Sequence, residues 1–222
     1  MCGRFTRTSP PAEVARLFRL PEPPAELAPR YNVAPSQVVA VVGLKPDGQR
    51  RGLAMLRWGL VPSWSNELNP KIKPINAKAE TLLERPTFRE CFLHKRCLIP
   101  ADGFYEWQKL DKAKQPYHIR MKGGGLFAFA GLWDVWSGGT EKVGTCCVIT
   151  TAANDLVRGI HDRMPAILKP EHYDAWLDPE TPTVDLLGML TPYPADEMEM
   201  VPVSSTVNSP KTDSPGCMAP AA

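Results

Sequence analysis

Residues 96–107 read RCLIPADGFYEW, and this stretch decides the fold. Apolar and aromatic residues lie on both sides of a polar step at Asp102 and Gly103, which predicts strands at 98–99 and 103–108. Three further segments rich in β-branched and aromatic residues follow at 117–121, 126–133 and 146–150. The middle of the chain is therefore predicted to be a β-meander.

Helices and further strands are expected on both sides of this meander. Pro10 and Pro11 mark a helix start, and apolar residues recur at helical spacing up to Phe18. Similar patterns predict helices at 77–83, 154–160, 170–177 and 184–190. Strands are expected at 37–43, 51–58 and 198–203, while 21–35 and 59–74 have the composition of loops. This order of elements predicts an α+β fold.

The chain of 222 residues fits one domain at 2–208, followed by a tail at 209–222 that we expect to be disordered. Hydrophobic residues make up 43%, which suits a sizeable core, and the net charge of +2 neither indicates nor excludes nucleic-acid binding. No apolar run approaches the roughly 18 residues of a membrane span, and the amino terminus lacks a secretion signal. We expect a cytoplasmic protein with no membrane partner.

The six cysteines are spaced irregularly and are expected to be reduced thiols. Cys91, His94 and Cys97 form a C-x2-H-x2-C cluster, but the second ligand pair of a zinc finger is missing. We interpret them as packing residues and expect neither a metal ion nor a cofactor.

The first five residues, Met1-Cys2-Gly3-Arg4-Phe5, carry the most distinctive chemistry. Methionine aminopeptidases remove Met1 before a small residue, so Cys2 would carry both an amine and a thiol. An aldehyde condenses with the amine to an imine, and the thiolate then closes a thiazolidine ring, which an internal cysteine cannot form. Reference pKa values of about 8 for the amine and about 8.5 for the thiol place both groups near neutrality. The alternative is a chance cysteine at the second position.

Three polar residues are candidates for a role beside Cys2. Glu106 lies among aromatic residues, where burial raises a carboxyl pKa and suits proton transfer; alternatively it points outward and pairs with Lys109. His161 lies on a loop, where it suits acid–base chemistry or a structural hydrogen bond. Asn76 has the position of a helix N-cap that can also present its amide to a site.

Basic and aromatic side chains are candidates for contacts with nucleic acid. The basic residues that suit phosphate contacts are Arg4, Arg30, Lys71, Lys73, Lys78, Arg85 and Arg89. Trp58 and Trp64 suit stacking on bases. Solvated surface charges and core tryptophans are the alternatives.

The chain resembles the SOS response-associated peptidase (SRAP) family in seven ordered segments within residues 2–203: MCGRF, RYNVAPSQ, RWGLVPSW, INAKAET, RCLIPADGFYEW, ITTAAN and IHDRMPAIL. The resemblance implies a single α+β domain of mixed and antiparallel sheets that curve into an open barrel with peripheral helices. It also implies a basic groove for single-stranded DNA, with the amino-terminal cysteine at its floor, and a covalent crosslink to abasic sites. We expect a monomer that associates with the nucleoid when it is bound to DNA.

This resemblance implies a catalytic role for four residues. Cys2 forms the thiazolidine, Asn76 orients the reacting groups, and Glu106 transfers protons during imine formation and ring closure. His161 assists opening of the sugar and reversal of the crosslink.

It also implies residues that contact DNA. Arg4, Lys78 and Arg163 match positions that face backbone phosphates. Pro35 and the segment Trp58-Gly59-Leu60 resemble a wedge that separates duplex from single strand, so junctions of the two are expected partners. Lys78 stands where the family commonly has arginine, and a lysine keeps the charge but loses bidentate phosphate binding.

Other functions remain open at this point. A cysteine peptidase would use Cys2, Glu106 and His161 on an amide bond and remove Met1 by autoproteolysis. A binding module would leave Cys2 without a role, and a general aldehyde scavenger would react equally with small aldehydes and with DNA. An imine that fails to close would permit strand cleavage at an abasic site, which is lyase activity.

Overall fold

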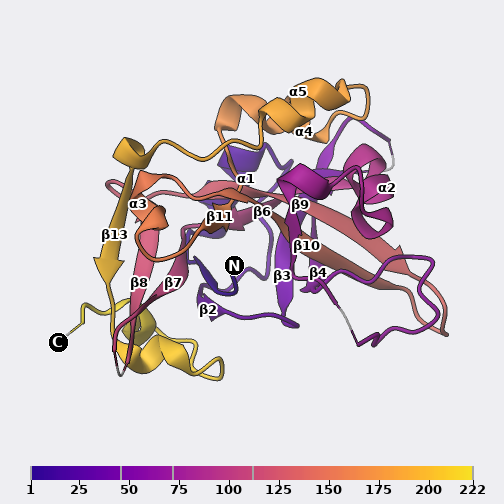
Figure 1. Cartoon of the computed structure of the whole chain (residues 1–222). Coiled ribbons are helices and arrows are strands. Elements are labelled where there is room, and N and C mark those ends of the chain that lie inside the picture. The colour runs from indigo at the N-terminus through magenta and orange to yellow at the C-terminus, as the bar shows by residue number, and fades with distance from the viewer. Residues whose placement is uncertain (1, 46, 72, 112, 222) are drawn as a thin grey trace.

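The computed structural model describes the chain except for residues 1, 46, 72, 112 and 222 (Figure 1). In this part of the chain the strands form a five-stranded sheet and an eight-stranded sheet. The smaller sheet is antiparallel throughout. Its strands, in spatial order, are β13 (Met198–Pro202), β8 (Lys114–Met121), β7 (Gly103–Lys109), β1 (Phe5–Arg7) and β2 (Arg30–Val33).

The larger sheet closes on itself. Its strands, in spatial order, are β11 (Arg163–Pro165), β10 (Val143–Ala152), β4 (Arg51–Trp58), β3 (Val38–Leu44), β6 (Arg96–Ala101), β9 (Phe127–Trp136) and β12 (Ile167–Leu168), with β5 (Asn76–Lys78) beside β10. β10 pairs with β9 as well as with β4, so β10, β4, β3, β6 and β9 form a ring. The single α+β domain with curved sheets is confirmed, but the ring is closed, whereas the resemblance implied an open barrel.

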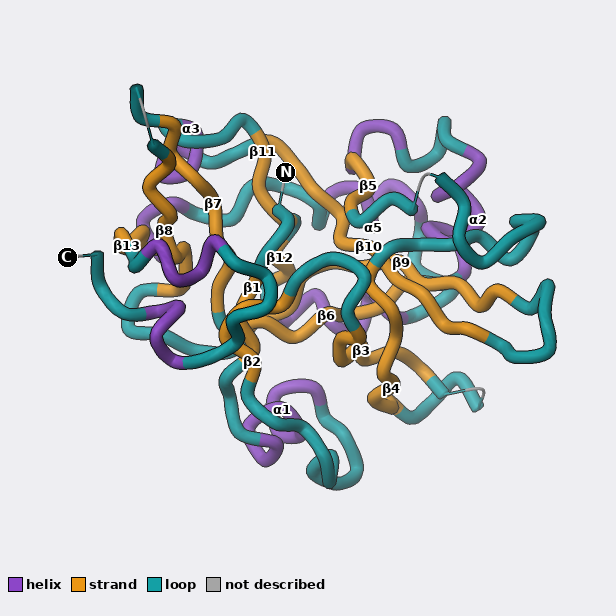
Figure 2. The backbone as a smooth tube through the Cα atoms, turned by 90° about the horizontal axis from the view of Figure 1, so that it is seen from below, coloured by secondary structure: helices purple, strands orange, loops and turns teal. Residues whose placement is uncertain are grey.

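Short helices lie around the strands (Figure 2). The α-helices are α1 (Pro11–Phe18), α2 (Pro86–His94), α3 (Asp155–Arg158), α4 (Tyr173–Leu177) and α5 (Thr183–Gly188). The 3-10 turns are η1 (Ala79–Thr81), η2 (Pro170–His172), η3 (Ala195–Glu197), η4 (Ser205–Asn208) and η5 (Pro215–Met218). None of the described helices is both long and apolar enough to cross a membrane.

Two large apolar cores hold these layers together, and a smaller cluster around Tyr105 packs the carboxyl-terminal segment. One core lies between the helices and the strands and includes Phe18, whose ring stacks on Tyr173 at 5.5 Å between centroids. The other includes Phe5 of β1, whose ring contacts Trp58 at 5.2 Å and Phe129 at 5.7 Å in edge-on geometry. Burial of such aromatic side chains contributes several kcal/mol in total, at about 1.5–3 kcal/mol each. The amino-terminal strand is therefore part of the core, and Cys2 lies directly before it.

Several local predictions are wrong because long-range pairing overrides local propensity. The segment predicted as a helix at 77–83 contains β5 and η1, since residues 76–78 pair in parallel with Val148–Thr150 of β10. β2 lies in the predicted loop 21–35, where it pairs with β1. The sequence prediction also missed α2, although Pro86 at its first position is a recognised start signal.

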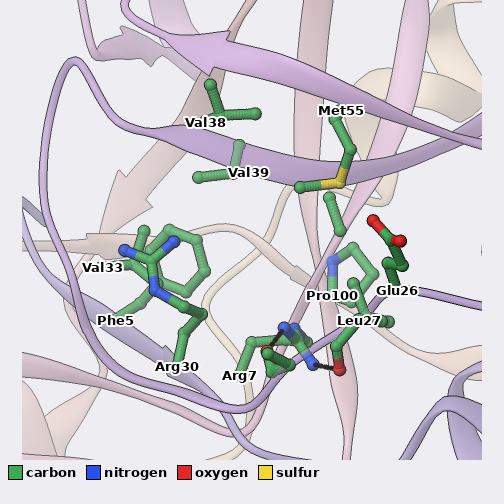
Figure 3. A pocket seen from close by; sticks show the side chains of 12 residues that line it. Phe5, Arg7, Glu26, Leu27, Arg30, Val33, Val38, Val39, Met55 and Pro100 are labelled. Atoms are coloured by element: carbon green, nitrogen blue, oxygen red, sulfur yellow. Dashed lines mark hydrogen bonds between the residues drawn. The ribbon is translucent and has the colours of Figure 1, made fainter. Parts of the chain in front are cut away.

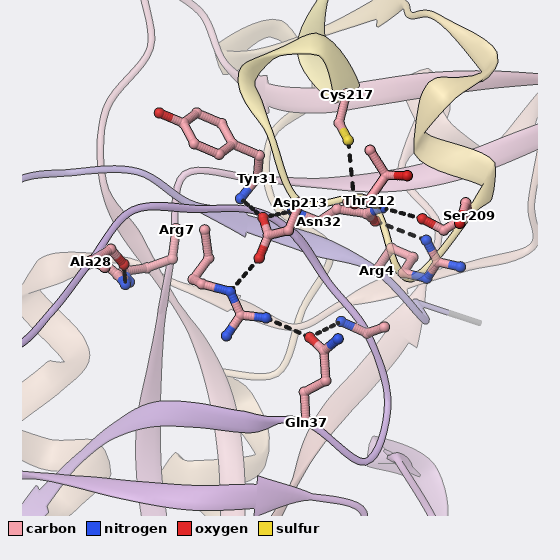
Figure 4. Close-up of polar contacts among 12 residues, drawn as sticks. Arg4, Arg7, Ala28, Tyr31, Asn32, Gln37, Ser209, Thr212, Asp213 and Cys217 are labelled. Atoms are coloured by element: carbon pink, nitrogen blue, oxygen red, sulfur yellow. Dashed lines mark hydrogen bonds and ion pairs between the residues drawn. The ribbon is translucent and has the colours of Figure 1, made fainter.

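The carboxyl-terminal segment is packed, contrary to the expected disordered tail (Figure 4). The Asp213 carboxylate accepts hydrogen bonds from the backbone N–H of Tyr31 at 2.6 Å and of Asn32 at 3.0 Å, and it pairs with Arg30. The Cys217 side chain is fully buried. Composition failed here because distant partners hold the segment in place, through polar contacts with β2 and through packing of Cys217 against Tyr105.

Candidate functional site

Cys2 lies at the centre of the candidate site and is fully buried. Its Sγ lies 3.8 Å from the carbonyl oxygen of Arg4, toward which the thiol donates. Burial raises the pKa of the thiol well above its ordinary value, and the nearby Glu106 carboxylate raises it further. The thiol is therefore protonated at neutral pH, and it needs a base at the moment it acts as a nucleophile.

Asn76 fixes the backbone at Cys2. Its Nδ2 donates a hydrogen bond to the Cys2 carbonyl oxygen at 2.9 Å. Its Oδ1 is buried and has no hydrogen-bond partner in the described part of the chain. Asn76 begins β5 and pairs with Val148, so the N-cap alternative is wrong. The Asn76 amide thus holds Cys2 through its Nδ2, while its Oδ1 is a buried acceptor without a donor. Such an unsatisfied acceptor destabilises the fold unless a bound ligand donates a hydrogen bond to it.

Glu106 connects the thiol with an open pocket. It belongs to β7, and its side chain is buried, with 6% of its surface exposed, while Lys109 on the same strand is exposed. An outward Glu106 paired with Lys109 is therefore excluded. Burial raises the pKa of the Glu106 carboxyl, and the nearby His161 partly offsets this rise. A carboxyl with a raised pKa is suited to donate and accept protons near neutral pH.

His161 lies at the same pocket as Glu106. It is in the connection between α3 and β11, and its side chain is 26% exposed. Its Nδ1 accepts a hydrogen bond from the Arg163 backbone N–H at 2.9 Å, and Asp162 Oδ1 lies 3.0 Å from the same nitrogen. These contacts orient the imidazole, which suits a group that exchanges protons with a ligand.

The pocket beside these residues has a volume of about 560 Å³. Its walls come from the β7–β8 hairpin and the loop after α3, and they are lined by Glu106, Trp107, Gln108, Lys109, Lys114, Gly159, Ile160, His161 and Asp162. The sequence prediction missed Trp107, Gln108 and Lys114 as lining residues, although they follow from the identification of Glu106 and of its hairpin. The pocket is polar and open, so it suits a charged, extended ligand better than a small apolar one.

A second pocket, of about 190 Å³, lies beside β1, β2, β3 and β4 (Figure 3). Its walls are mainly apolar, and Arg7 within it donates hydrogen bonds to the carbonyl oxygens of Leu27 and Ala28. None of the four predicted catalytic residues lines this pocket. Glu106 and His161 line the larger pocket, whereas Cys2 and Asn76 line neither of the two.

Two arginines predicted to bind phosphates already have partners within the protein. The guanidinium of Arg4 donates to the carbonyl oxygens of Val207 and Asn208 and lies 5.8 Å from the centre of the Trp107 ring. Arg163 makes two hydrogen bonds to the Glu80 carboxylate, at 2.6 and 2.8 Å. Both arginines thus connect elements around the site.

The other predicted DNA contacts are divided between surface and core. Lys78 and Arg85 are exposed. The wedge segments lie together, since the Ser36 N–H, directly after Pro35, donates to the Trp58 carbonyl oxygen at 2.8 Å. Gly59 follows with a φ of 136°, a conformation that favours glycine.

The two tryptophans proposed for base stacking differ in exposure. Trp58 is fully buried, and its Nε1 donates to the Ile75 carbonyl oxygen, so the prediction that Trp58 stacks on bases is wrong for this conformation. Leu60 beside it is also fully buried. Trp64 is 64% exposed and available to a ligand.

The described residues contain no group of three or more His, Cys, Asp or Glu side chains that could hold a metal ion. Cys91 lies in the core between helices and strands, and Cys97 lies in the core around Phe5. Both thiols have raised pKa values, mainly because they are buried. These cysteines pack in the interior.

Comparison with known proteins identifies a common family. The model of the family described as SOS response associated peptidase (SRAP) matches residues 1–210. The chain is 47% identical to abasic site processing protein YoqW of Bacillus subtilis, over 97% of each chain. It is 37% identical to abasic site processing protein HMCES of Xenopus tropicalis, over 86% of this chain and 66% of that protein.

Solved structures of further proteins have the same fold as this chain. A crystal structure of a Bacteroides thetaiotaomicron protein superposes with a TM-score of 0.89 and 26% identity over 100% of both chains. A phage-related protein of Bordetella bronchiseptica superposes with a TM-score of 0.73 and 31% identity, over 92% of this chain and 95% of that one. The chain therefore belongs to the SOS response-associated peptidase (SRAP) family.

Proposed function

We propose that this protein processes abasic sites in single-stranded DNA by forming a thiazolidine crosslink through Cys2, which shields the lesion. The observation that carries this proposal is the position of Cys2 between two polar groups. Asn76 holds its carbonyl group, and Glu106 acts on its thiol and lines the pocket with His161. The names of the relatives, abasic site processing proteins, support the same substrate.

The reaction begins after removal of Met1. The amine of Cys2 adds to the aldehyde carbon of the open abasic sugar, and loss of water gives an imine. The thiol then adds to the imine carbon, its proton passes to the nitrogen, and a thiazolidine ring forms. One water molecule is released overall, and no redox step occurs.

The protonation behaviour of Glu106 suits these reaction steps. Its raised pKa favours a protonated carboxyl, which can donate to the departing hydroxyl group during imine formation. The carboxylate that results can accept the proton of the Cys2 thiol, whose raised pKa keeps it protonated until then. His161 at the pocket is placed to exchange the proton involved in opening of the sugar ring. Asn76 orients the reacting groups.

Contacts with the DNA would come from several sides. Lys78, Arg85 and Trp64 are exposed and suit phosphate contacts or stacking. Pro35, which is partly exposed, would contact a junction of single- and double-stranded DNA, while the buried segment Trp58-Gly59-Leu60 would support it from the interior. We propose that the protein acts as a monomer on DNA in the cytoplasm.

Arg4 and Arg163 can serve as phosphate contacts only if DNA displaces part of their present interactions. The Glu80 carboxylate accepts two hydrogen bonds from the Arg163 guanidinium, which is the geometry that a phosphate would also use. Phosphate binding at Arg163 therefore requires Glu80 to move.

A peptidase is the second candidate function. Cys2, Glu106 and His161 combine a thiol, a carboxyl and an imidazole around one site, which suits attack on an amide bond and autoproteolytic removal of Met1. Lyase activity would follow from an imine that does not close to the thiazolidine. Both activities use the same residues as the crosslink.

The decisive experiment mixes protein lacking Met1 with an oligonucleotide that contains one abasic site. We expect a species that survives denaturation, with the combined mass of protein and DNA less one water. Cys2→Ala should form no stable species, but borohydride should trap its imine, because its new terminus is still an amine. No crosslink with the unmodified sequence, or an equal yield with Cys2→Ala, would exclude the thiazolidine. Turnover of peptides under the same conditions would favour the peptidase.

A further inference from the structure

We propose that Lys109 and Lys114 form a phosphate-binding subsite for the DNA backbone on one side of the abasic nucleotide. This inference rests on the proposed function, because it places the strand that continues from the site of the crosslink. The ligand is a backbone phosphate of single-stranded DNA, which is bound by charge and carries no base specificity.

The two lysines face each other across the β7–β8 hairpin. They are direct partners in the antiparallel register, at the ends of their strands. Side chains at such positions have Cβ atoms about 4.5–5.5 Å apart. Both lysines are exposed, and both line the pocket that also contains Glu106 and His161. Their ammonium groups can therefore reach one anion at the end of this pocket.

This arrangement is unfavourable for the hairpin alone. Like charges directly opposite each other destabilise an antiparallel pair. Neither ammonium forms an ion pair with any residue that the structure describes. The one acidic residue besides Glu106 that lines the pocket is Asp162, which lies beside His161. An anion bound between the lysines would remove the repulsion.

The pocket geometry favours a polymer that continues past the reacting sugar. Glu106 and Lys109 are three residues apart on β7, which corresponds to about 10 Å along an antiparallel strand and places their side chains on opposite faces of it. Both border the pocket, which runs along the edge of β7 where its pairing with β1 has ended at Phe104. The subsite is thus displaced from the reacting carbon and suits a neighbouring phosphate. Trp107 forms a fixed wall between them, because its Nε1 donates to Asn208 Oδ1 at 2.7 Å.

The position of the hairpin also indicates on which side of the lesion the subsite lies. In Figures 1 and 2, β7 and β8 lie to one side of the amino-terminal segment, whereas α2 lies to the other. Arg85 directly precedes α2. A strand that crosses Cys2 would therefore meet Lys109 and Lys114 on one flank of the lesion and Arg85 toward the other.

Lys114→Glu provides a test that separates binding from folding. It replaces the repulsive pair with an attractive one, so the free protein should have a higher Tm than the unmodified protein. Binding of DNA should become weaker, and the crosslinking rate at subsaturating DNA should fall about tenfold. The slope of log K against log salt should become smaller by about 0.7 for each phosphate that the variant no longer binds. Lys142→Glu, in the exposed β9–β10 turn, is the matched control.

Oligonucleotides with nucleotides on only one side of the abasic site test the direction. The effect of Lys114→Glu should persist on one of these substrates and disappear on the other. Equal weakening on both, or the same weakening with Lys142→Glu, would mean a general charge effect and overturn the subsite. An unchanged salt slope would also overturn it.

The subsite can be tested separately from the crosslink. Equilibrium binding of an ordinary single-stranded oligonucleotide, without an abasic site, should show the same weakening in Lys114→Glu. If the unmodified protein forms no crosslink but Lys114→Glu still weakens binding, the proposed chemistry fails while the subsite stands. If crosslinking occurs and the two proteins bind equally well, the subsite fails alone.

Discussion

Arg4 donates a hydrogen bond from Nη1 to Asn32 Oδ1 at 2.8 Å, which joins the residue before β1 to β2. Asn32 is fully buried, and its Nδ2 lies within hydrogen-bond distance of three carbonyl oxygens of the carboxyl-terminal segment, those of Val207, Ser209 and Thr212. The Arg4 carbonyl oxygen in turn accepts hydrogen bonds from the Cys2 thiol and from the Tyr105 backbone N–H. One buried amide thus connects the packed tail with the nucleophile.

Asn32→Asp should therefore reduce stability and crosslinking together. The new carboxyl group would face three carbonyl oxygens without the amide donor, and a buried unsatisfied polar group costs about 1–3 kcal/mol. We expect a decrease of about 3 kcal/mol or more in the free energy of unfolding, measured with denaturant. Asn66→Ala, at an exposed position, is the control and should change stability by less than about 0.5 kcal/mol. An Asn32→Asp variant as stable as the unmodified protein would show that the tail does not depend on this amide.

Glu106→Gln should change how stability depends on pH. The folded-state pKa of Glu106 lies above its ordinary value of 4.5, so the folded state binds this proton more tightly than the unfolded state. This contribution is present below pH 4.5 and is lost as pH rises toward the folded pKa. The difference in Tm between Glu106→Gln and the unmodified protein should therefore increase in favour of the variant as pH rises above about 4.5.

The same variant should crosslink more slowly, since glutamine cannot donate or accept the proton. General acid–base groups contribute about 100-fold to 10,000-fold to a rate, so a decrease of at least about 100-fold is expected at pH 7. Glu84→Gln is exposed and serves as the control for both measurements. A Tm difference that stays constant with pH would contradict the raised pKa.

Glu80→Gln tests whether Arg163 can bind DNA. The Glu80 carboxylate accepts hydrogen bonds from the Arg163 guanidinium, and this contact lowers the pKa of Glu80. Neutralising Glu80 should strengthen binding of single-stranded DNA at low salt, by about fivefold, and should destabilise the fold by under about 1 kcal/mol because the carboxylate is half-exposed. Fluorescence anisotropy across a salt series measures this change, and Lys78→Gln should have the opposite effect. Binding that is unchanged in Glu80→Gln would assign Arg163 a structural role only.

Gly103→Ala should separate β7 from β8. A Cβ atom at residue 103 would lie 2.2 Å from His118 Nε2 and 2.9 Å from the Ile119 carbonyl oxygen, so the strands would have to move. His118 is buried, with a pKa lowered to about 4 mainly by that burial, and its Nε2 lies 3.0 Å from the Thr6 hydroxyl. We expect the free energy of unfolding to fall by about 2–4 kcal/mol.

The matched control for that change is Gly188→Ala in α5. A Cβ atom there meets nothing within 4 Å, and alanine favours a helix over glycine. Its stability should stay equal or rise by up to about 1 kcal/mol. Equal effects of the two substitutions on Tm would show that the β7–β8 contact tolerates the added carbon.

Local patterns in the sequence were enough to predict most strands and to propose a chemistry for one residue. The alternation and aromatic content around 103–108 and 117–121 predicted β7 and β8, which in turn carry Glu106 and its pocket. The amino-terminal cysteine indicated aldehyde chemistry because that reaction needs only an amine and a thiol on one residue. The strand predictions succeeded because neighbouring residues contain that information, and the aldehyde chemistry stays a prediction.

Asn76 shows where local inference stops. Its sequence context is that of a helix N-cap, but pairing with β10 places it in a strand, where its amide reaches Cys2 across 74 positions of sequence. The tail shows the same limit, since its composition is that of a disordered segment, while its contacts with Asn32 and the packing of Cys217 against Tyr105 hold it in place. In both places a distant partner satisfies the polar groups.

The sequence by itself therefore determined most of the strand pattern and the α+β class, and it suggested Cys2 as the reactive group. Only the tertiary structure decided that β9 and β10 close the ring, that Asn76 and Glu106 meet at Cys2, and that Lys109 lies opposite Lys114. The physical reason is that propensity and periodicity act over a few neighbouring residues, whereas pairing register and burial depend on residues that are distant along the chain.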